Sequence, residues 1–277
     1  MKISMKWIGD YVDLSGVDLN DLITKFGLRT AEVEDVYQVG KDISGVIVAR
    51  ILEVNPHPNS THLHKLKVDT GKEVLDIVCG APNVRPNMKV ALATIGGSVK
   101  GMKIEKAVIA GEESYGMCCS KEELGFSEGD KGIWEVQDAL PLGTDIKTVY
   151  DLEDTIFEVD NKSLTNRPDL WCHYGIAREI SAILDRPLRP IVTENLQYYA
   201  QNGMVDIDVQ SDNCYRYSAL KVGNVTKKVS PIGVEIRLFY CGMRAINLLA
   251  DITQISATKK SKFEHIIKFN IKYFSFQ

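Results

Sequence analysis

The feature that most constrains this chain is a series of five short β-like segments between Gly45 and Trp134. They read VIVARILEV, LHKLKVD, EVLDIVCG, MKVALATIG and MKIEKAVIAG. Glycine, proline or asparagine turn signals bound each segment, as in TGKE, GAPNVRPN and GGSVKGM. Short strands at this spacing favour a small closed barrel. We therefore predict an OB-fold β-barrel over residues 40–148.

Helices and further strands are predicted on both sides of the barrel. DLNDLITKFG predicts a helix with Asp18 as N-cap and Gly27 as stop. NRPDLWCHYGIAREISAILDRP predicts the clearest helix, with Pro168 in its first position and an apolar face that needs a partner. TAEVEDVYQV and TIFEVDN alternate as strands do. We predict that residues 1–39 and 149–200 form one α+β host domain, into which the barrel is inserted.

Residues 201–253 predict the start of a third unit. MVDIDVQ and CYRYSALKVGNV alternate as strands, and Ser230 and Pro231 start a helix through Leu238. INLLADIT predicts the next strand. Residues 254–277 form a divergent tail with neither caps nor turn signals. The predicted fold class is a multi-domain α+β protein whose third unit is incomplete.

Composition indicates a soluble, cytoplasmic protein. The mean hydropathy is -0.10, and no apolar run approaches the roughly 18 residues of a membrane span. The N-terminus has acidic residues where a signal peptide has an apolar core. The six cysteines lack the spacing of a disulfide scaffold or zinc site, so we expect reduced, mostly buried thiols and no metal.

The charge distribution restricts any nucleic-acid contact to a local surface. The formal net charge is -4, which argues against a uniformly basic surface. Residues 40–148 contain 13 Lys or Arg, 15 Asp or Glu, and three aromatic residues, Tyr115, Phe126 and Trp134. Single-strand binders of the OB type stack several bases on aromatic rings. We therefore expect weak contact through shape and backbone.

The segment HPNSTHLHKLKVD carries the sharpest chemical signal. It holds His57, His62 and His64 beside Lys65. A turn of this composition offers hydroxyls, amides and imidazoles to a phosphate or a base edge. It equally fits a turn that only caps itself. A metal site is a weaker alternative, since His62 and His64 would share a strand face with only His57 nearby.

The cysteines of GEESYGMCCSKEELG are a second candidate for chemistry. A nucleophile at Cys118 or Cys119 would need a histidine partner and an activating environment. Burial as structural thiols is the favoured interpretation. In the same segment, Ser120 and Glu123 predict a capping box before a short helix.

Three phrases in order, HPNSTHLHKLKVD, IVCGAPNVRPNMKVALATIGG and SYGMCCSKEELG, resemble the tRNA-binding barrel shared by several tRNA-associated proteins. The flanking phrases resemble the N-terminal third of the bacterial phenylalanine–tRNA ligase β-subunit family, over about residues 1–253. These phrases are MKISMKWIGDYVDL, DNKSLTNRPDLWCHYGIAREISAIL and SPIGVEIRLFYCGMRAINLLADIT.

The resemblance implies an α₂β₂ enzyme whose α subunit holds the ATP- and magnesium-dependent chemistry. The β chain would support assembly, tRNA(Phe) binding and hydrolysis of mischarged tyrosyl-tRNA. Residues 201–253 would begin a B3/B4-type editing domain. We expect no catalytic residue, cofactor or metal in this chain itself, and six residues as the best placed for RNA contact. They are His57, Asn59, His62, Lys65, Asn83 and Lys89.

The chain departs from the family pattern near its end. Gln254 stands where the family has Asn, and Ala245 where it has Pro. Beyond Thr253 the sequence is unfamiliar, so we expect a truncated or divergent chain without the catalytic domain and most of the editing domain. Whether it is an enzyme is left open. The alternatives are a scaffold or stand-alone tRNA-binding module, and a hydrolase acting through Asp251 or a cysteine.

Overall fold

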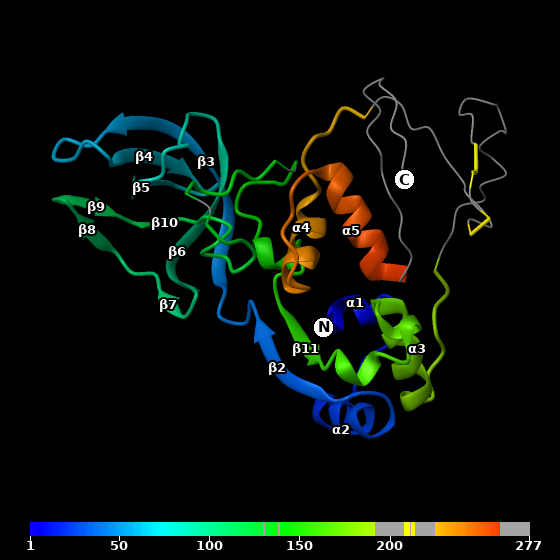
Figure 1. The fold of residues 1–277 in the computed structure, drawn as a ribbon. Coiled ribbons are helices and arrows are strands. Elements are labelled where there is room, and N and C mark those ends of the chain that lie inside the picture. Colours follow the sequence, from blue (N-terminus) through cyan, green and yellow to red (C-terminus); the bar gives the residue numbers. More distant parts are fainter. Residues whose placement is uncertain (130, 138, 192–207, 211, 214–224, 261–277) are drawn as a thin grey trace.

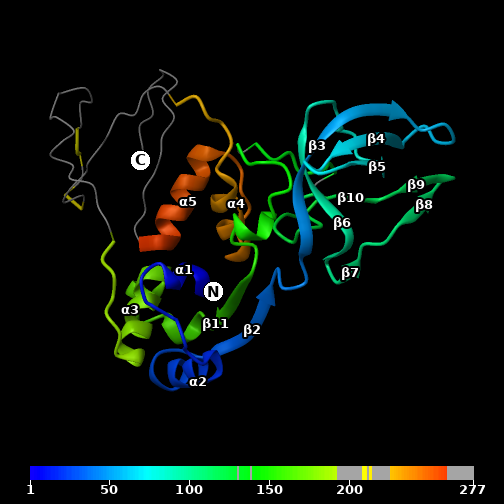
Figure 2. The same cartoon turned by 180° about the vertical axis from the view of Figure 1, so that it is seen from behind.

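The computed structural model describes residues 1–129, 131–137, 139–191, 208–210, 212–213 and 225–260. Within this part, a large curved sheet forms one side of the molecule, and a smaller sheet with its helices forms the other (Figure 1). Seen from behind, two further helices lie beside both sheets (Figure 2). The fold is mixed α+β with mostly sheet content.

The larger sheet is antiparallel and has the strand order β10-β6-β3-β4-β5, with β7 paired to β6. Its strands are β3 (Ser44–Pro56), β4 (His64–Asp69), β5 (Val74–Cys79), β6 (Lys89–Val99), β7 (Met102–Lys103) and β10 (Gly116–Cys118). The sheet curls on itself: the amide of Tyr115, just before β10, donates to the Asp76 carbonyl oxygen in β5 at 2.9 Å. The two ends of the strand order therefore meet.

Both faces are covered over residues 46–51 of β3 and 90–93 of β6, which explains the nearly continuous apolar sequences there. Ala49 and Ile51 face a cluster with Leu66, inside the curled sheet. Val46 and Val48 face the opposite cluster, which includes Trp134 and other residues that follow β10. A strand covered on both faces loses the polar alternation of a half-exposed one.

The prediction of one strand over MKIEKAVIAG was wrong. The structure divides it into β7 and β8 (Ala107–Ile109), and β8 pairs with β9 (Glu112–Ser114) as a separate two-stranded ribbon. The amide of Ile104 donates to the Gly97 carbonyl oxygen at 2.8 Å, and the Ile104 side chain is buried. Ile104 thus closes the pairing with β6, and the chain then leaves the larger sheet.

The smaller sheet has the order β1-β11-β2 and joins distant parts of the chain. Its elements and helices are β1 (Lys2–Ser4), α1 (Met5–Gly9), α2 (Leu19–Arg29), β2 (Val33–Val39), η1 (Ile146–Thr148), β11 (Asp154–Val159), η2 (Lys162–Leu164), η3 (Pro168–Leu170) and α3 (His173–Leu184). Trp7, Phe26, Phe157 and Ile176 meet in its core. The predicted strands at TAEVEDVYQV and TIFEVDN are confirmed as β2 and β11.

The helix predictions near this sheet are confirmed in place but not at every boundary. The Asp18 side chain caps α2 by accepting from the Asn20 amide at 2.9 Å. Gly27 does not stop α2, which continues to Arg29 because no left-handed turn occurs at Gly27. Pro168 begins the short helix η3 rather than α3, because Cys172 provides the N-cap of α3 and the chain turns between them.

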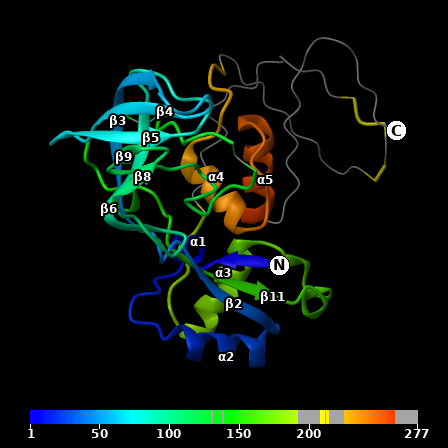
Figure 3. The same cartoon turned by 90° about the vertical axis from the view of Figure 1, so that its left-hand side faces the viewer.

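Two helices follow the smaller sheet, α4 (Ile232–Tyr240) and α5 (Leu248–Lys260). They lie next to the larger sheet and α1 (Figure 3). The helix predicted after Pro231 is confirmed as α4. The strand predicted at INLLADIT was wrong: Asn247 accepts from the amides of Leu249 and Ala250, both at 3.1 Å, and so caps a helix. The predicted strands MVDIDVQ and CYRYSALKVGNV lie almost wholly outside the described residues.

Candidate nucleic-acid interface

The connection between β3 and β4 lies against the tip of the β8–β9 ribbon. His57 is 4% exposed. Its Nδ1 accepts from the Asn59 amide at 3.1 Å, which leaves Nε2 as the donor toward the Ile109 carbonyl oxygen at 3.3 Å. The ring of His57 therefore joins the connection to the ribbon and is not free to bind RNA.

Asn59 makes a second link to the same tip. Its side-chain amide donates to the Ala110 carbonyl oxygen at 3.0 Å. Ala110 and Gly111 both have positive φ, at 52° and 95°, a conformation that costs an alanine energy. The contacts from His57 and Asn59 hold this tight turn in place.

A groove of about 630 Å³ runs between β4 and the ribbon and is lined by lysine–carboxylate pairs. Lys65 Nζ lies 2.6 Å from Glu112 Oε2, and Lys67 Nζ lies 2.8 Å from Asp76 Oδ1. All four side chains are partly exposed. Pairs of this kind contribute little to stability, roughly 0–1 kcal/mol, so a phosphate can compete for the lysines at low cost.

The ribbon supplies a third cation beside an aromatic ring. Lys106 Nζ lies 2.7 Å from Glu113 Oε1 and 4.8 Å from the centre of the Tyr115 ring. The Tyr115 hydroxyl donates to Glu113 at 2.6 Å. Hydrogen bonds with Glu113 and Tyr115 raise the pKa of Lys106, so its ammonium stays charged at neutral pH. Tyr115 was identified from the sequence, but its pairing with Lys106 was not, because MKIEKAVIAG was predicted as one strand and not as part of a separate ribbon.

The other predicted site residues divide into two groups. His62 is exposed, and its side chain makes no hydrogen bond within the described part of the chain. Asn83 instead clamps the backbone of Ile133, donating at 2.9 Å and accepting at 3.0 Å. Lys89 donates to the Leu140 carbonyl oxygen at 2.7 Å. The structure thus places His57, Asn59 and Lys65 against the β8–β9 ribbon, leaves His62 exposed in the same connection, and uses Asn83 and Lys89 elsewhere.

The cysteines near this interface are buried, as expected. Burial raises the pKa of Cys119 to about 12 and holds that of Cys118 well above its usual range. Neither is therefore a thiolate at neutral pH. Across the described ranges, no group of three or more His, Cys, Asp or Glu residues is arranged to hold a metal ion.

The groove and its ribbon lie within a recognised family domain. Residues 46–145 match the family described as "Putative tRNA binding domain". Over 259 residues the chain is 40% identical to the phenylalanine–tRNA ligase β subunit of Syntrophus aciditrophicus, covering 91% of this chain and 32% of that protein. The chain is similar to the N-terminal region of phenylalanine–tRNA ligase β subunits.

Two further β subunits show the same extent of similarity. Those of Geobacter metallireducens and Bacillus subtilis are 41% and 38% identical over 260 and 268 residues. Each match covers 91% of this chain and 32% of the relative. The chain thus spans about a third of the length of the phenylalanine–tRNA ligase β subunits that it matches.

Two solved structures show only a distant likeness. The C-terminal domain of Plasmodium vivax p43 is 22% identical with a TM-score of 0.27, covering 35% of this chain and 56% of that one. A MetRS-related protein from Pyrococcus horikoshii is 21% identical with a TM-score of 0.28, covering 36% and 85%. Likenesses this weak leave the fold to be argued from the strand pairing above.

Among the described residues, every helix is too short or too polar to span a membrane.

Proposed function

We propose that this chain gives weak, auxiliary tRNA binding and supports subunit assembly, as the N-terminal part of a phenylalanine–tRNA ligase β subunit. The observation that carries the proposal is the groove between β4 and the ribbon, which lies within the residues matched to the tRNA-binding family. Its two lysines, Lys65 and Lys67, and the neighbouring Lys106, which pairs with Glu113 of the groove, suit phosphate contact without base readout.

The larger sheet supports the OB-fold part of this proposal. Five short antiparallel strands that curl until their ends meet are typical of this small barrel. The strands β1 and β2 precede the larger sheet in the chain and β11 follows it. We infer that residues 40–148 are inserted into a host domain made of residues 1–39 and 149–200. Residues 201–253 would begin an editing-type domain, followed by a divergent sequence over residues 254–277, of which residues 254–260 belong to α5.

We assign the partners by the same similarity. They are tRNA(Phe) and a ligase α subunit, in an α₂β₂ assembly located in the cytoplasm. ATP and magnesium would serve the whole enzyme through that α subunit. Pull-down of a bacterial α subunit by this chain supports the assembly role, and no capture would contradict it.

The scaffold alternative gains no support from the exposed apolar residues. A pure scaffold would expose apolar patches on the host domain rather than on the barrel. The larger sheet and its ribbon expose Leu52, Val74, Ile95, Met102, Val108 and Ile109. The smaller sheet, its helices and the connection before β11 expose Leu28, Val36, Val149 and Trp171. Tyrosine release from mischarged tRNA by this chain would instead favour a hydrolase.

Filter binding of tRNA(Phe) tests the proposal. We expect retention at low salt that is lost as salt rises, because phosphate contacts release counterions. Absence of retention at every salt concentration would rule out tRNA binding by this chain.

A further inference from the structure

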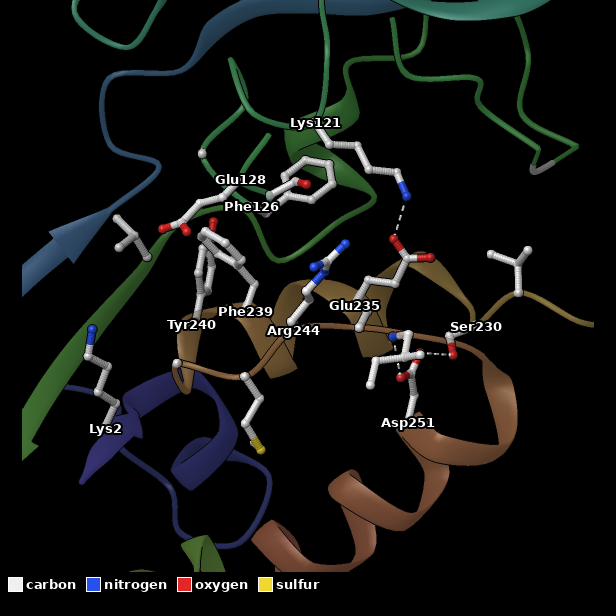
Figure 4. Close-up of a pocket in the computed structure, with 18 of the residues that line it drawn as sticks. Lys2, Lys121, Phe126, Glu128, Ser230, Glu235, Phe239, Tyr240, Arg244 and Asp251 are labelled. Carbon is white, nitrogen blue, oxygen red and sulfur yellow. Dashed lines mark hydrogen bonds and ion pairs between the residues drawn. The ribbon is translucent and has the colours of Figure 1, made fainter. Parts of the chain in front are cut away.

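A cavity of about 590 Å³ lies where three parts of the chain meet, and the proposed tRNA contact makes no use of it. One wall comes from β1 and β2, and a second from the turn at residues 121–128. The third comes from α4 and the connection to α5 (Figure 4). Cavities of roughly 300–1,000 Å³ are the size of small-molecule sites.

Aromatic rings form the apolar side of the cavity. Phe126 and Tyr240 are buried, and Phe239 is partly buried beside them. The Tyr240 hydroxyl donates to the Leu152 carbonyl oxygen at 2.7 Å, so its polar end is already occupied. The ring of Phe239 therefore lines the cavity beside Tyr240, whose hydroxyl needs no further hydrogen-bond partner.

The buried carboxylates in the lining already have partners. Glu235 forms an ion pair with Lys121. Asp251 is 1% exposed and accepts from the Ser230 hydroxyl at 2.6 Å and from the Ile246 amide at 2.8 Å. Glu235 and Asp251 therefore form part of the cavity wall, and neither buried carboxylate needs a charged partner from a ligand.

Arg244 differs from the other cations in the lining. Lys121 is paired with Glu235, and Lys2 lies 5.5 Å from the centre of the Tyr37 ring. Within the described residues, the Arg244 guanidinium has no ion pair, hydrogen bond or ring contact. Figure 4 shows it extending between Phe239 and Glu235, toward the side on which Lys121 lies. At this end of the cavity, Lys121 and the exposed Arg244 thus share the carboxylate of Glu235. Glu128, the remaining acidic residue of the lining, lies on the Tyr240 side of the cavity (Figure 4), so Arg244 has no acidic partner of its own here.

We propose that this cavity binds a small ligand that carries a planar ring and an anionic group. The anionic group lies between Arg244 and Lys121, where guanidinium and ammonium donors form charge-assisted hydrogen bonds. The ring stacks on Phe239, as bases and other planar groups do on aromatic side chains. A nucleoside monophosphate and an aromatic amino acid share this chemistry.

Isothermal titration calorimetry of the full chain with AMP and, separately, with phenylalanine distinguishes these sources. We expect one of the two to bind. Arg244→Ala should weaken that binding about tenfold or more, as loss of a charge-assisted contact does. Phe239→Leu, which keeps an apolar side chain but removes the ring, should weaken it about fivefold.

The matched control is Arg29→Ala, which removes an exposed arginine of α2 from the far side of the smaller sheet. This variant should bind as the parent chain does, and thermal unfolding should show that all three variants are folded. The proposal is overturned if neither ligand binds at millimolar concentration. Equal binding by the parent chain and a folded Arg244→Ala variant would overturn it too.

Discussion

Gly40 lies so close to Leu152 that a Cβ atom on Gly40 would be 1.7 Å from the Leu152 carbonyl oxygen. Gly40 also has a φ of +68°, which other residues rarely adopt. These two residues mark where the chain enters and leaves the larger sheet, just after β2 and just before β11. The close approach of the two backbones fixes how the larger sheet is attached to the smaller one.

Gly40→Ala should therefore destabilise the protein. The added methyl group forces the two backbones apart and places alanine at positive φ, so we expect a loss of about 2 kcal/mol or more in the free energy of unfolding. Chemical denaturation measures it. Gly27→Ala is the control, since it meets open space inside α2 and should be neutral or stabilising by about 0.5–1 kcal/mol. Equal effects would contradict the close approach.

His57 should be a structural residue of the interface. His57→Ala removes its contacts with Asn59 and Ile109 and leaves buried groups unpaired, so the free energy of unfolding should fall by about 1–3 kcal/mol. Faster hydrogen exchange at the ribbon tip would accompany the loss. His62→Ala, at an exposed position, should change stability by less than about 0.5 kcal/mol. A His57→Ala protein as stable as the parent would show that the ribbon needs no such support.

Asn247 should determine where α5 begins. Asn247→Ala removes the side-chain oxygen that accepts from Leu249 and Ala250, at a cost of about 1 kcal/mol in the free energy of unfolding. Asn161→Ala is the matched control, because Asn161 precedes η2 without a side-chain capping bond. An equal loss in both variants would indicate that the cap contributes nothing specific.

His173 should make stability depend on pH. Burial lowers its pKa from 6.5 to about 3, and its Nε2 accepts from the Ser4 amide at 3.1 Å. The folded state thus holds His173 neutral, whereas the unfolded chain takes up a proton below about pH 6.5. Its contribution is fully present above that pH and is lost as the pH falls toward 3, at up to about 1.4 kcal/mol per pH unit.

Denaturation at pH 6.5 and at pH 5 measures this dependence. The parent chain should lose roughly 2 kcal/mol from this residue, and His173→Gln should lose correspondingly less between the two values. His62→Gln, which alters an exposed histidine, should follow the parent chain. A His173→Gln variant with the parent's full pH dependence would contradict the burial of a neutral imidazole.

The sequence predicted those parts of the fold that depend on contacts between residues close together in the chain. Asp18 caps α2 because its side chain reaches the Asn20 amide within the same turn. Turn signals around VIVARILEV and MKVALATIG predicted two strands, and both are present as β3 and β6. INLLADIT misled because its apolar residues suit either a strand or a helix, and the capping role of Asn247 was overlooked.

The roles of site residues depended on partners far away in the sequence. Asn83 binds the backbone of Ile133, and Lys89 binds that of Leu140. Nothing near Asn83 or Lys89 in the sequence indicates these contacts, so both resembled free polar groups. Lys106 was missed for a related reason, since its closeness to Tyr115 depends on the turn of the ribbon. Its signal was the short separation between a lysine and a tyrosine flanking a Gly-containing turn.

The most direct test of tRNA binding by the groove is filter binding of tRNA(Phe) to a triple variant, Lys65→Ala, Lys67→Ala and Lys106→Ala. The matched control removes three exposed lysines outside the groove, Lys41, Lys162 and Lys227. The groove variant should bind at least about tenfold more weakly at low salt. The slope of its log binding constant against log salt concentration should be smaller, by an amount that corresponds to roughly two to three lost phosphate contacts. The control should bind as the parent chain does. Equal affinity of the two variants, or a greater loss in the control, would contradict tRNA binding at the groove.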